Sequence, residues 1–218
     1  MNPPTFSTLT IALADGIAEV RLNRPDKSNA MNEAMWQEIR QAFEWVDATP
    51  AARVAILSGA GKNFCAGIDL SMLASIQQGI ADPDGARSRE ALRRLILDLQ
   101  DCLSSIERCR KPVLAAIQGA CVGGALDMVT CCDMRYASDD AVFAIKEIDL
   151  AMIADVGTLQ RLPHLIGEGL MRELAYTGRN IGASEAEKIG LINQKLPSNE
   201  ALTATVCELA KTIAAKSP

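Results

Sequence analysis

Two glycine-containing turns, each following an apolar strand, constrain the fold of this chain more than any other sequence feature. Residues 54–57 lead to the turn at 64–70, and residues 112–117 lead to the turn at 118–127. Each turn is expected to begin a helix, whose first backbone N–H groups lack intrahelical acceptors and can meet an anion. Two such turns facing each other would hold one developing oxyanion. Either turn alone is better explained by tight packing, because glycine is the default turn residue.

Strands and helices alternate along the rest of the chain, which favours an α/β fold. The expected strands cover 8–13, 17–22, 54–57, 112–117, 133–137 and 141–145. The expected helices cover 32–48, 69–78, 89–109, 125–132, 158–166, 169–177, 184–189 and 200–216, with a loop at 79–88. The helix at 89–109 is the clearest, because its apolar residues recur at helical spacing.

Composition narrows the class of protein and its partners. Hydrophobic residues make up 49% of the 218 residues, which predicts a large core, and aromatic residues make up only 4%. The net charge is −5 and no run of Lys or Arg stands out, so neither nucleic acid nor an anionic membrane is expected as a partner. The seven cysteines contain no Cys-x-x-Cys pair and are expected to be free thiols. Without a recognisable signal peptide or transmembrane run, we expect a cytoplasmic protein.

Three carboxylates stand in apolar surroundings and are candidates for proton transfer. Asp127 follows the second turn, and Glu147 and Asp155 flank the apolar stretch 150–154. Burial and like charges raise the pKa of a carboxyl group, which suits acid–base work near neutral pH. The alternative for each is a structural role, as a helix cap or in a salt bridge to Arg135 or Lys146.

The remaining reactive side chains carry weaker signals. His164 has no evident orienting partner in the sequence, and one histidine does not make a typical zinc site. Cys65 lies in the first turn without a nearby base, so we interpret it as a small wall residue rather than a nucleophile. The segment 59–62 lacks the residues of a phosphate-binding loop.

At the two turns the chain resembles the crotonase superfamily of enoyl-CoA hydratases and isomerases. The resemblance runs from about residue 8 to the C-terminus, and its motifs occur in the family's order. They are Asn23-Arg24-Pro25 with Asn29-Ala30-Met31, Phe64-Cys65-Ala66-Gly67-Ile68-Asp69-Leu70, and Gln118-Gly119-Ala120-Cys121-Val122-Gly123-Gly124. It implies a single domain over 1–218, built as a spiral of ββα units with a helical C-terminal part. It also implies homotrimers or hexamers, and an expected truncation of the usual C-terminal helical tail.

The resemblance assigns roles to both turns. The backbone N–H groups of Ile68 and Gly124 would form an oxyanion hole for the enolate of an acyl-CoA thioester. The substrate-binding residues that it implies are Lys27, Ala66, Gly67, Ile68, Asp69, Leu70 and Gly124. Lys27 and Lys62 are expected partners of the CoA phosphates, because each stands beside a groove motif and carries a point charge.

The carboxylates select a branch of the superfamily. Asp127 and Glu147 match the positions of the two hydratase glutamates, whereas Asp155 stands where hydratases have a glycine-rich stretch. The segments 146–149 and 154–163 are similar to those of Δ3,5-Δ2,4-dienoyl-CoA isomerases, enzymes of fatty-acid β-oxidation. That similarity implies Asp155 as the C2 base, Glu147 as the C6 acid and Asp127 as a third polar group in the pocket. It implies no metal or redox cofactor, since coenzyme A arrives with the substrate.

Two other functions stay open at this point. One is an enoyl-CoA hydratase or another crotonase reaction, because a fold hosts several chemistries. The other is a non-catalytic acyl-CoA-binding protein, a hypothesis that the presence of Asp127, Glu147 and Asp155 disfavours. For a eukaryotic source, the peroxisome or mitochondrion joins the cytoplasm as an expected location.

Overall fold

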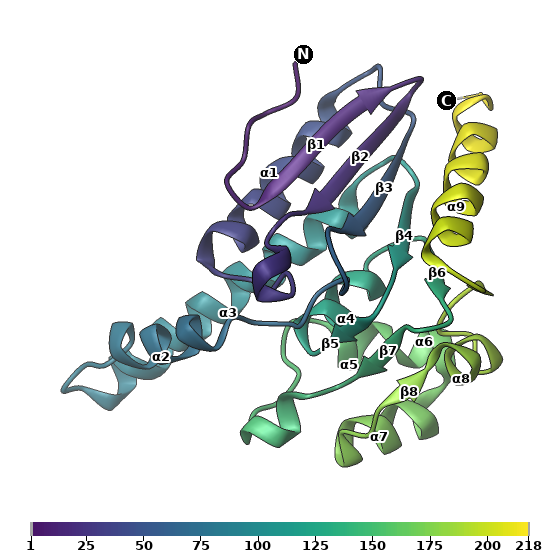
Figure 1. The fold of residues 1–218 in the computed structure, drawn as a ribbon. Coiled ribbons are helices and arrows are strands. Elements are labelled where there is room, and N and C mark those ends of the chain that lie inside the picture. Colours follow the sequence, from purple (N-terminus) through teal and green to yellow (C-terminus); the bar gives the residue numbers. More distant parts are fainter. Residues whose placement is uncertain (1, 218) are drawn as a thin grey trace.

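The computed structural model describes residues 2–217, and two sheets organise them (Figure 1). The larger sheet has the order β1-β2-β3-β4-β6-β9; β1 and β2 pair antiparallel, and the other neighbours pair parallel. Its strands are β1 (Leu9–Ala14), β2 (Ile17–Leu22), β3 (Val54–Gly59), β4 (Val113–Ile117), β6 (Met134–Ser138) and β9 (Gln194–Leu196). The smaller sheet contains β5 (Ala120–Val122), β7 (Val142–Ala144) and β8 (Ile181–Gly182).

Helices cover both faces of the larger sheet. The long helices are α1 (Glu33–Ala48), α2 (Leu70–Gly79), α3 (Gly85–Arg108), α7 (Glu168–Thr177) and α9 (Asn199–Ala214). The shorter helices are α4 (Gly124–Thr130), α5 (Thr158–Arg161), α6 (Pro163–Ile166) and α8 (Ala183–Lys188), with 3-10 turns η1 (Pro25–Lys27) and η2 (Glu147–Leu150). The mixed α/β class predicted from the sequence is therefore confirmed.

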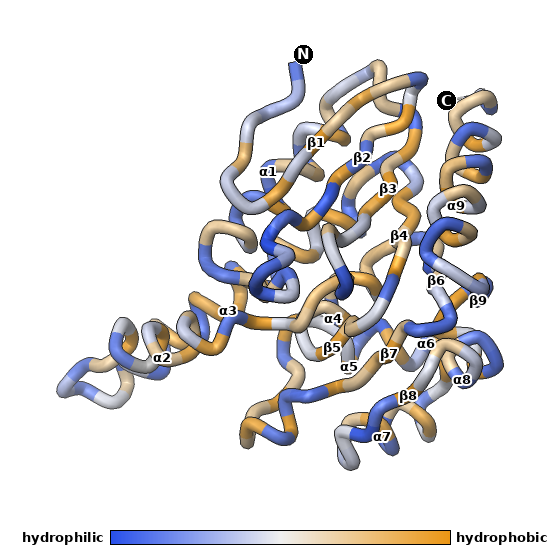
Figure 2. Tube along the Cα trace, in the orientation of Figure 1, coloured by the Kyte–Doolittle hydropathy of each residue, from blue (hydrophilic) through white to orange (hydrophobic). Residues whose placement is uncertain are grey.

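Alternation along the central strands explains the layers. In β3, Val54 and Ile56 pack with α9, whereas Ala55 and Leu57 enter the main core on the opposite face. Successive side chains of a strand point to opposite faces, so an uninterrupted apolar run suits a strand that is covered on both sides. Figure 2 shows this as a hydrophobic tube along β3, with α1 and α9 on either side of the sheet.

The connection between α2 and α3 differs from the sequence prediction. The loop expected at 79–88 is confined to residues 80–84, because α3 already begins at Gly85. The Asp84 side chain accepts a hydrogen bond from the Ala86 N–H at 2.8 Å and caps the helix there. The helices α2 and the first half of α3 project from the body as an arm (Figure 1). Leu92, on this arm, is 37% exposed, so the apolar face of α3 is not wholly core.

Several short elements were not predicted. They include β5, β8, β9 and the two 3-10 turns, none longer than four residues. Such segments are too short to show a period of their own in the sequence. Among residues 2–217, no helix is both long and apolar enough to cross a bilayer.

Candidate active site

The two glycine turns lie side by side. Cys65 donates its N–H to the Ala120 carbonyl at 2.9 Å, and Val122 donates to the Cys65 carbonyl at 3.3 Å. Gly67 has φ +86°, and a Cβ added there would lie 2.7 Å from the Val122 carbonyl oxygen. Only glycine meets both demands without strain. The two turns thus lie next to each other as predicted, and their close approach explains why residue 67 is glycine.

The backbone N–H groups of Ile68 and Gly124 are free at this junction. Within residues 2–217, neither group donates to a protein acceptor. Gly124 is the first residue of α4, after Gly123 at φ +56°. The position of a Cβ added to Gly67 would be 3.5 Å from the Gly124 nitrogen, which shows how near the two turns come. Two unpaired donors from different segments are the geometry that an oxyanion hole requires.

Two cavities meet at these donors. The first, which we call the mouth pocket, has a volume of about 400 Å³. It is lined by Lys27, Ala30, Ala66, Gly67, Ile68, Asp69, Leu70, Gly123, Gly124, Lys146, Glu147, Leu150 and Met152. The second, which we call the apolar pocket, has about 100 Å³ and lies toward the α2–α3 arm. The two share Ile68, Gly124, Glu147 and Met152. An opening whose lining includes Lys27, Asp69 and Lys146 thus leads past the free donors into an apolar chamber.

Two half-buried carboxylates line the apolar pocket. Glu147 lies at the junction of the two cavities, with Oε1 3.2 Å from the place of a Cβ on Gly123. Asp155 lines the apolar pocket but not the mouth pocket. Burial, followed by the charge of Asp155, raises the pKa of Glu147, and burial raises the pKa of Asp155. Two carboxyl groups with raised pKa values at one apolar cavity suit proton transfer near neutral pH.

Asp127 occupies a different place from the one expected. Its side chain is fully buried and lines neither cavity, so it is not a polar group of the pocket wall. The sequence could not show this, because α4 is buried over its whole length. Its Oδ1 accepts the Thr158 N–H at 2.5 Å, and Oδ2 has no partner within residues 2–217. Burial and the neighbouring Glu147 raise the pKa of Asp127 to about 7.

The predicted substrate-binding residues all line the mouth pocket, and one of them, Asp69, also has a structural role. Asp69 forms an ion pair with Arg24 at 3.0 Å and caps α2 through the Ser71 N–H at 3.1 Å. It therefore also fixes the first turn against the 24–31 segment. Lys27 lines the mouth pocket, whereas Lys62 is exposed and outside its lining.

The two reactive residues that we set aside lie away from this chemistry. His164 is exposed in a crevice between α3 and α5. The Cys65 thiol is fully buried, its Sγ lies 3.0 Å from the Asn29 carbonyl oxygen, and burial raises its pKa to about 12. A thiol in that state is a poor nucleophile. Within residues 2–217, no group of three or more His, Cys, Asp or Glu side chains is arranged to hold a metal ion.

Sequence reasoning missed the walls of both cavities. Lys146 lines the mouth pocket, where its Nζ donates to the Gly178 carbonyl at 2.7 Å. The apolar pocket takes Trp36 from α1, Leu73 and Ile76 from α2, and Leu92, Leu95, Ile96 and Leu99 from α3. The apolar face of α3 was the available signal, but a helical period does not distinguish core from cavity wall.

Sequence comparison places the chain among known proteins. A profile of the enoyl-CoA hydratase/isomerase family matches residues 13–218. The chain is 48% identical over 222 residues to the peroxisomal Delta(3,5)-Delta(2,4)-dienoyl-CoA isomerase of Arabidopsis thaliana, covering 100% of this chain and 80% of that protein. It is 46% identical over 204 residues to the mitochondrial protein of the same name from Homo sapiens. That match covers 93% of this chain but 62% of the human protein.

Solved structures of enoyl-CoA hydratases and isomerases have the same fold as this chain. An enoyl-CoA hydratase from Bacillus anthracis superposes with a TM-score of 0.85 at 33% identity, covering 97% of this chain and 78% of that one. An enoyl-CoA hydratase/isomerase from Xanthobacter autotrophicus Py2 gives a TM-score of 0.88 at 30% identity, covering 98% and 76%. These neighbours confirm the fold class expected from the resemblance.

Proposed function

The chain belongs to the enoyl-CoA hydratase/isomerase family, and from this we propose that it isomerises 3,5-dienoyl-CoA to 2,4-dienoyl-CoA. The most similar relatives named above carry that activity in their names. The observation in the site that supports it is the pair Glu147 and Asp155, which line one apolar cavity next to the free Ile68 and Gly124 donors.

The two cavities suit the two ends of such a substrate. In this proposal the thioester oxygen lies between the N–H groups of Ile68 and Gly124, and the acyl chain extends into the apolar pocket. Removal of a proton from C2 places negative charge on the thioester oxygen, where the two donors stabilise it. The CoA part follows the mouth pocket toward Lys27.

The reaction then needs two proton-transfer groups. A 3,5-to-2,4 shift removes a proton at C2 and adds one at C6, at opposite ends of a conjugated system. We assign Asp155 as the C2 base and Glu147 as the C6 acid, as the family resemblance implies. Their raised pKa values help in both directions, since a carboxylate with a higher pKa is a better base and a carboxyl with a higher pKa stays protonated nearer neutral pH.

The proposal extends to cofactors, location and assembly. The shift moves protons without changing the overall oxidation state of the substrate, so we propose that no redox cofactor or metal takes part. We propose a cytoplasmic location, with the peroxisome and mitochondrion as the alternatives that the relatives' names supply. We also propose a homotrimer or a hexamer.

The direct test of the reaction is a comparison of two substrates by ultraviolet absorbance. A 2,4-diene is conjugated with the thioester carbonyl and a 3,5-diene is not, so isomerisation produces a new absorption band. We expect turnover of 3,5-dienoyl-CoA to exceed hydration of 2-enoyl-CoA. Preferred hydration would make the chain a hydratase, and binding of both substrates without turnover would make it an acyl-CoA-binding protein.

A further inference from the structure

The segment that carries Asp155 makes few backbone hydrogen bonds, although the Ala154 and Val156 side chains beside Asp155 are buried in the main core. Residues 151–157 lie in neither a helix nor a strand. Among the residues that the structure describes, a single hydrogen bond joins the backbone of 153–156 to the rest of the chain: Gln100 Nε2 donates to the Asp155 carbonyl at 2.5 Å. Gln100 lies on α3, one residue after Leu99 of the apolar pocket wall.

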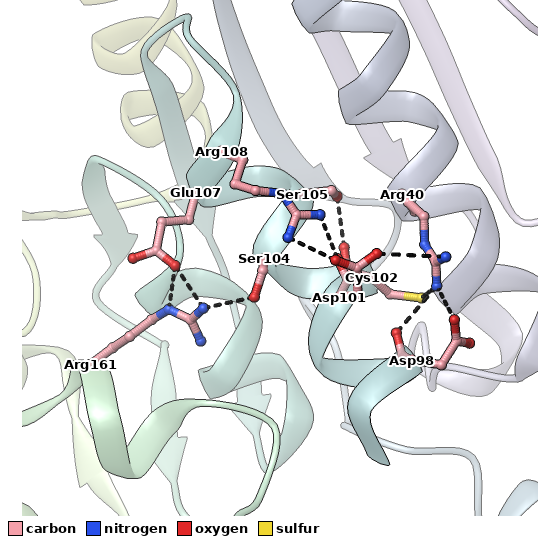
Figure 3. Close-up of polar contacts among 9 residues, drawn as sticks. All are labelled: Arg40, Asp98, Asp101, Cys102, Ser104, Ser105, Glu107, Arg108 and Arg161. Atoms are coloured by element: carbon pink, nitrogen blue, oxygen red, sulfur yellow. Dashed lines mark hydrogen bonds and ion pairs between the residues drawn. The ribbon is translucent and has the colours of Figure 1, made fainter. Parts of the chain in front are cut away.

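Arg161 holds the other end of this segment against the same helix. Its guanidinium donates to Glu107 Oε2 from Nε at 3.0 Å and from Nη2 at 2.7 Å, and Nη2 also donates to Ser104 Oγ at 3.0 Å. Figure 3 shows this guanidinium beside α3, with Glu107 and Ser104 directed toward it. Arg161 is only 17% exposed, which favours a stronger interaction than a fully solvated pair gives.

Gly157 shows that the Arg161 guanidinium lies across the segment itself. A Cβ added to Gly157 would stand 1.7 Å from Arg161 Nη1, and Gly157 has φ +130°. The backbone therefore passes under the guanidinium at a point where any other residue would have to displace the Arg161 side chain and adopt a strained φ. The next residue, Thr158, donates its N–H to Asp127. One short stretch thus carries Asp155 and also holds Asp127.

The helix that receives these contacts is fixed on its other side. Arg40 of α1 donates to Asp98 Oδ1 at 2.5 Å and to Cys102 Sγ at 2.8 Å, and lies 3.6 Å from Asp101 (Figure 3). Since α3 is tied to α1 here, it can act as a rigid support for the 153–161 segment. The same helix supplies Leu95 and Leu99 to the apolar pocket.

We propose that Gln100 and Arg161 are positioning residues, which hold Asp155 against the acyl chain from the surface of α3. This rests on the proposed function, because it assigns Asp155 a proton to move. Neither residue is required to touch the substrate: Arg161 lines neither cavity described above, and Gln100 acts on a carbonyl oxygen. A misplacement of about 1 Å at a reacting group can cost about 100-fold in rate.

The test uses Arg161→Gln and Gln100→Met, each close in size to its parent and lacking the contact. Arg108→Gln is the matched control, because Arg108 forms an ion pair with Asp101 on α3 at 2.7 Å without contacting 153–161 (Figure 3). We expect kcat on 3,5-dienoyl-CoA to fall about 10- to 100-fold in both test variants, with little change in acyl-CoA affinity. Arg161→Lys should recover part of the loss, since it keeps the charge beside Glu107.

Amide hydrogen exchange gives a second readout that needs no turnover. We expect faster exchange over 153–161 in both test variants, with α9 unchanged and the Arg108→Gln control like the parent. Rates and exchange in both test variants matching the control would overturn the positioning role. A parent without isomerase activity would contradict the proposed function instead, and exchange would still decide whether α3 holds the segment. If Arg161→Gln does not fold, Gln100→Met carries the same test.

Discussion

Thr158 donates its backbone N–H to Oδ1 of Asp127 at 2.5 Å, inside the core and behind the cavity that the other two carboxylates line. This contact joins the first turn of α5 to α4, the helix whose first N–H is a free donor of the site. Asp127 therefore couples the donor helix to the segment that carries Asp155. Its second oxygen, Oδ2, is buried without a protein partner within residues 2–217.

The first prediction concerns the charge of Asp127. Burial, with the charge of Glu147, raises its pKa to about 7 from an ordinary value of 3.8. A raised folded-state pKa gives stability that is fully present below about pH 4 and is lost as the pH rises through about 7. Asp127→Asn keeps the oxygen that accepts from Thr158 and removes this dependence. Relative to the parent, the variant should gain stability between pH 4 and pH 8, by at most about 4 kcal/mol.

Urea unfolding at both pH values measures this difference. The comparison is between the variant and the parent, so that other titrating groups cancel. An equal difference in the free energy of unfolding at pH 4 and pH 8 would show that Asp127 titrates as an ordinary carboxylate.

The second prediction concerns the contact between the glycine turns. Gly67→Ala places a Cβ 2.7 Å from the Val122 oxygen at φ +86°. The turn must then shift, and we expect a loss of about 1–3 kcal/mol in stability together with reduced turnover. Gly169→Ala in α7 is the control, because a Cβ there meets nothing within 4 Å. Thermal unfolding and turnover of both variants check this, and equal effects would mean that the closeness of the turns is unimportant.

The third prediction concerns coenzyme A. Because Lys27 lines the mouth pocket, acyl-CoA binding should weaken as salt rises, and Lys27→Gln should flatten that dependence. The expected loss at low salt is about 1 kcal/mol or less, the range of an exposed ion pair. Lys62→Gln makes a parallel test, since Lys62 lies outside that lining. Calorimetric titration at two salt concentrations suffices, and an affinity independent of salt would remove both lysines from phosphate binding.

The fourth prediction concerns assembly. Exposed apolar side chains line the mouth pocket, including Leu70 at 65% and Leu150 at 46%. A contact between subunits would bury such surface, in accord with the proposed trimer or hexamer. Light scattering at two protein concentrations should show a mass of three or six chains. A monomer at both concentrations would contradict the proposal.

The two turns could be predicted because they depend on local signals, whereas the choice of Ile68 and Gly124 as donors came from the resemblance to the crotonase superfamily. Glycine, a preceding apolar strand and a following helix are all visible in the residues around Gly67 and Gly124. The complete burial of the Asp127 side chain could not be predicted, because uncharged neighbours in the sequence occur both at cavity walls and in the core. The support of Asp155 by Gln100 was equally hidden, since 55 residues separate the two partners. Both features depend on contacts between residues that are far apart in the sequence, which a local pattern does not reveal.

The central claim is that Asp155 removes the C2 proton. Asp155→Asn preserves size and removes the charge, and its half-buried site should accept the amide without unfolding. A positioned general base contributes about 10²–10⁴-fold to a rate, so kcat on 3,5-dienoyl-CoA should fall by that range. Acyl-CoA affinity should change far less, because both free donors remain. If Asp155 were only structural, asparagine would serve nearly as well.

The most direct measurement is the exchange of the C2 hydrogens of 3,5-dienoyl-CoA with D₂O, followed by NMR together with turnover. Glu147→Gln serves as the matched variant, since it removes the proposed C6 acid from the same cavity. We predict that Glu147→Gln loses isomerisation but retains C2 exchange, whereas Asp155→Asn loses both. A turnover rate for Asp155→Asn within about threefold of the parent, far less than the loss expected for a general base, or C2 exchange abolished only by Glu147→Gln, would contradict the assignment.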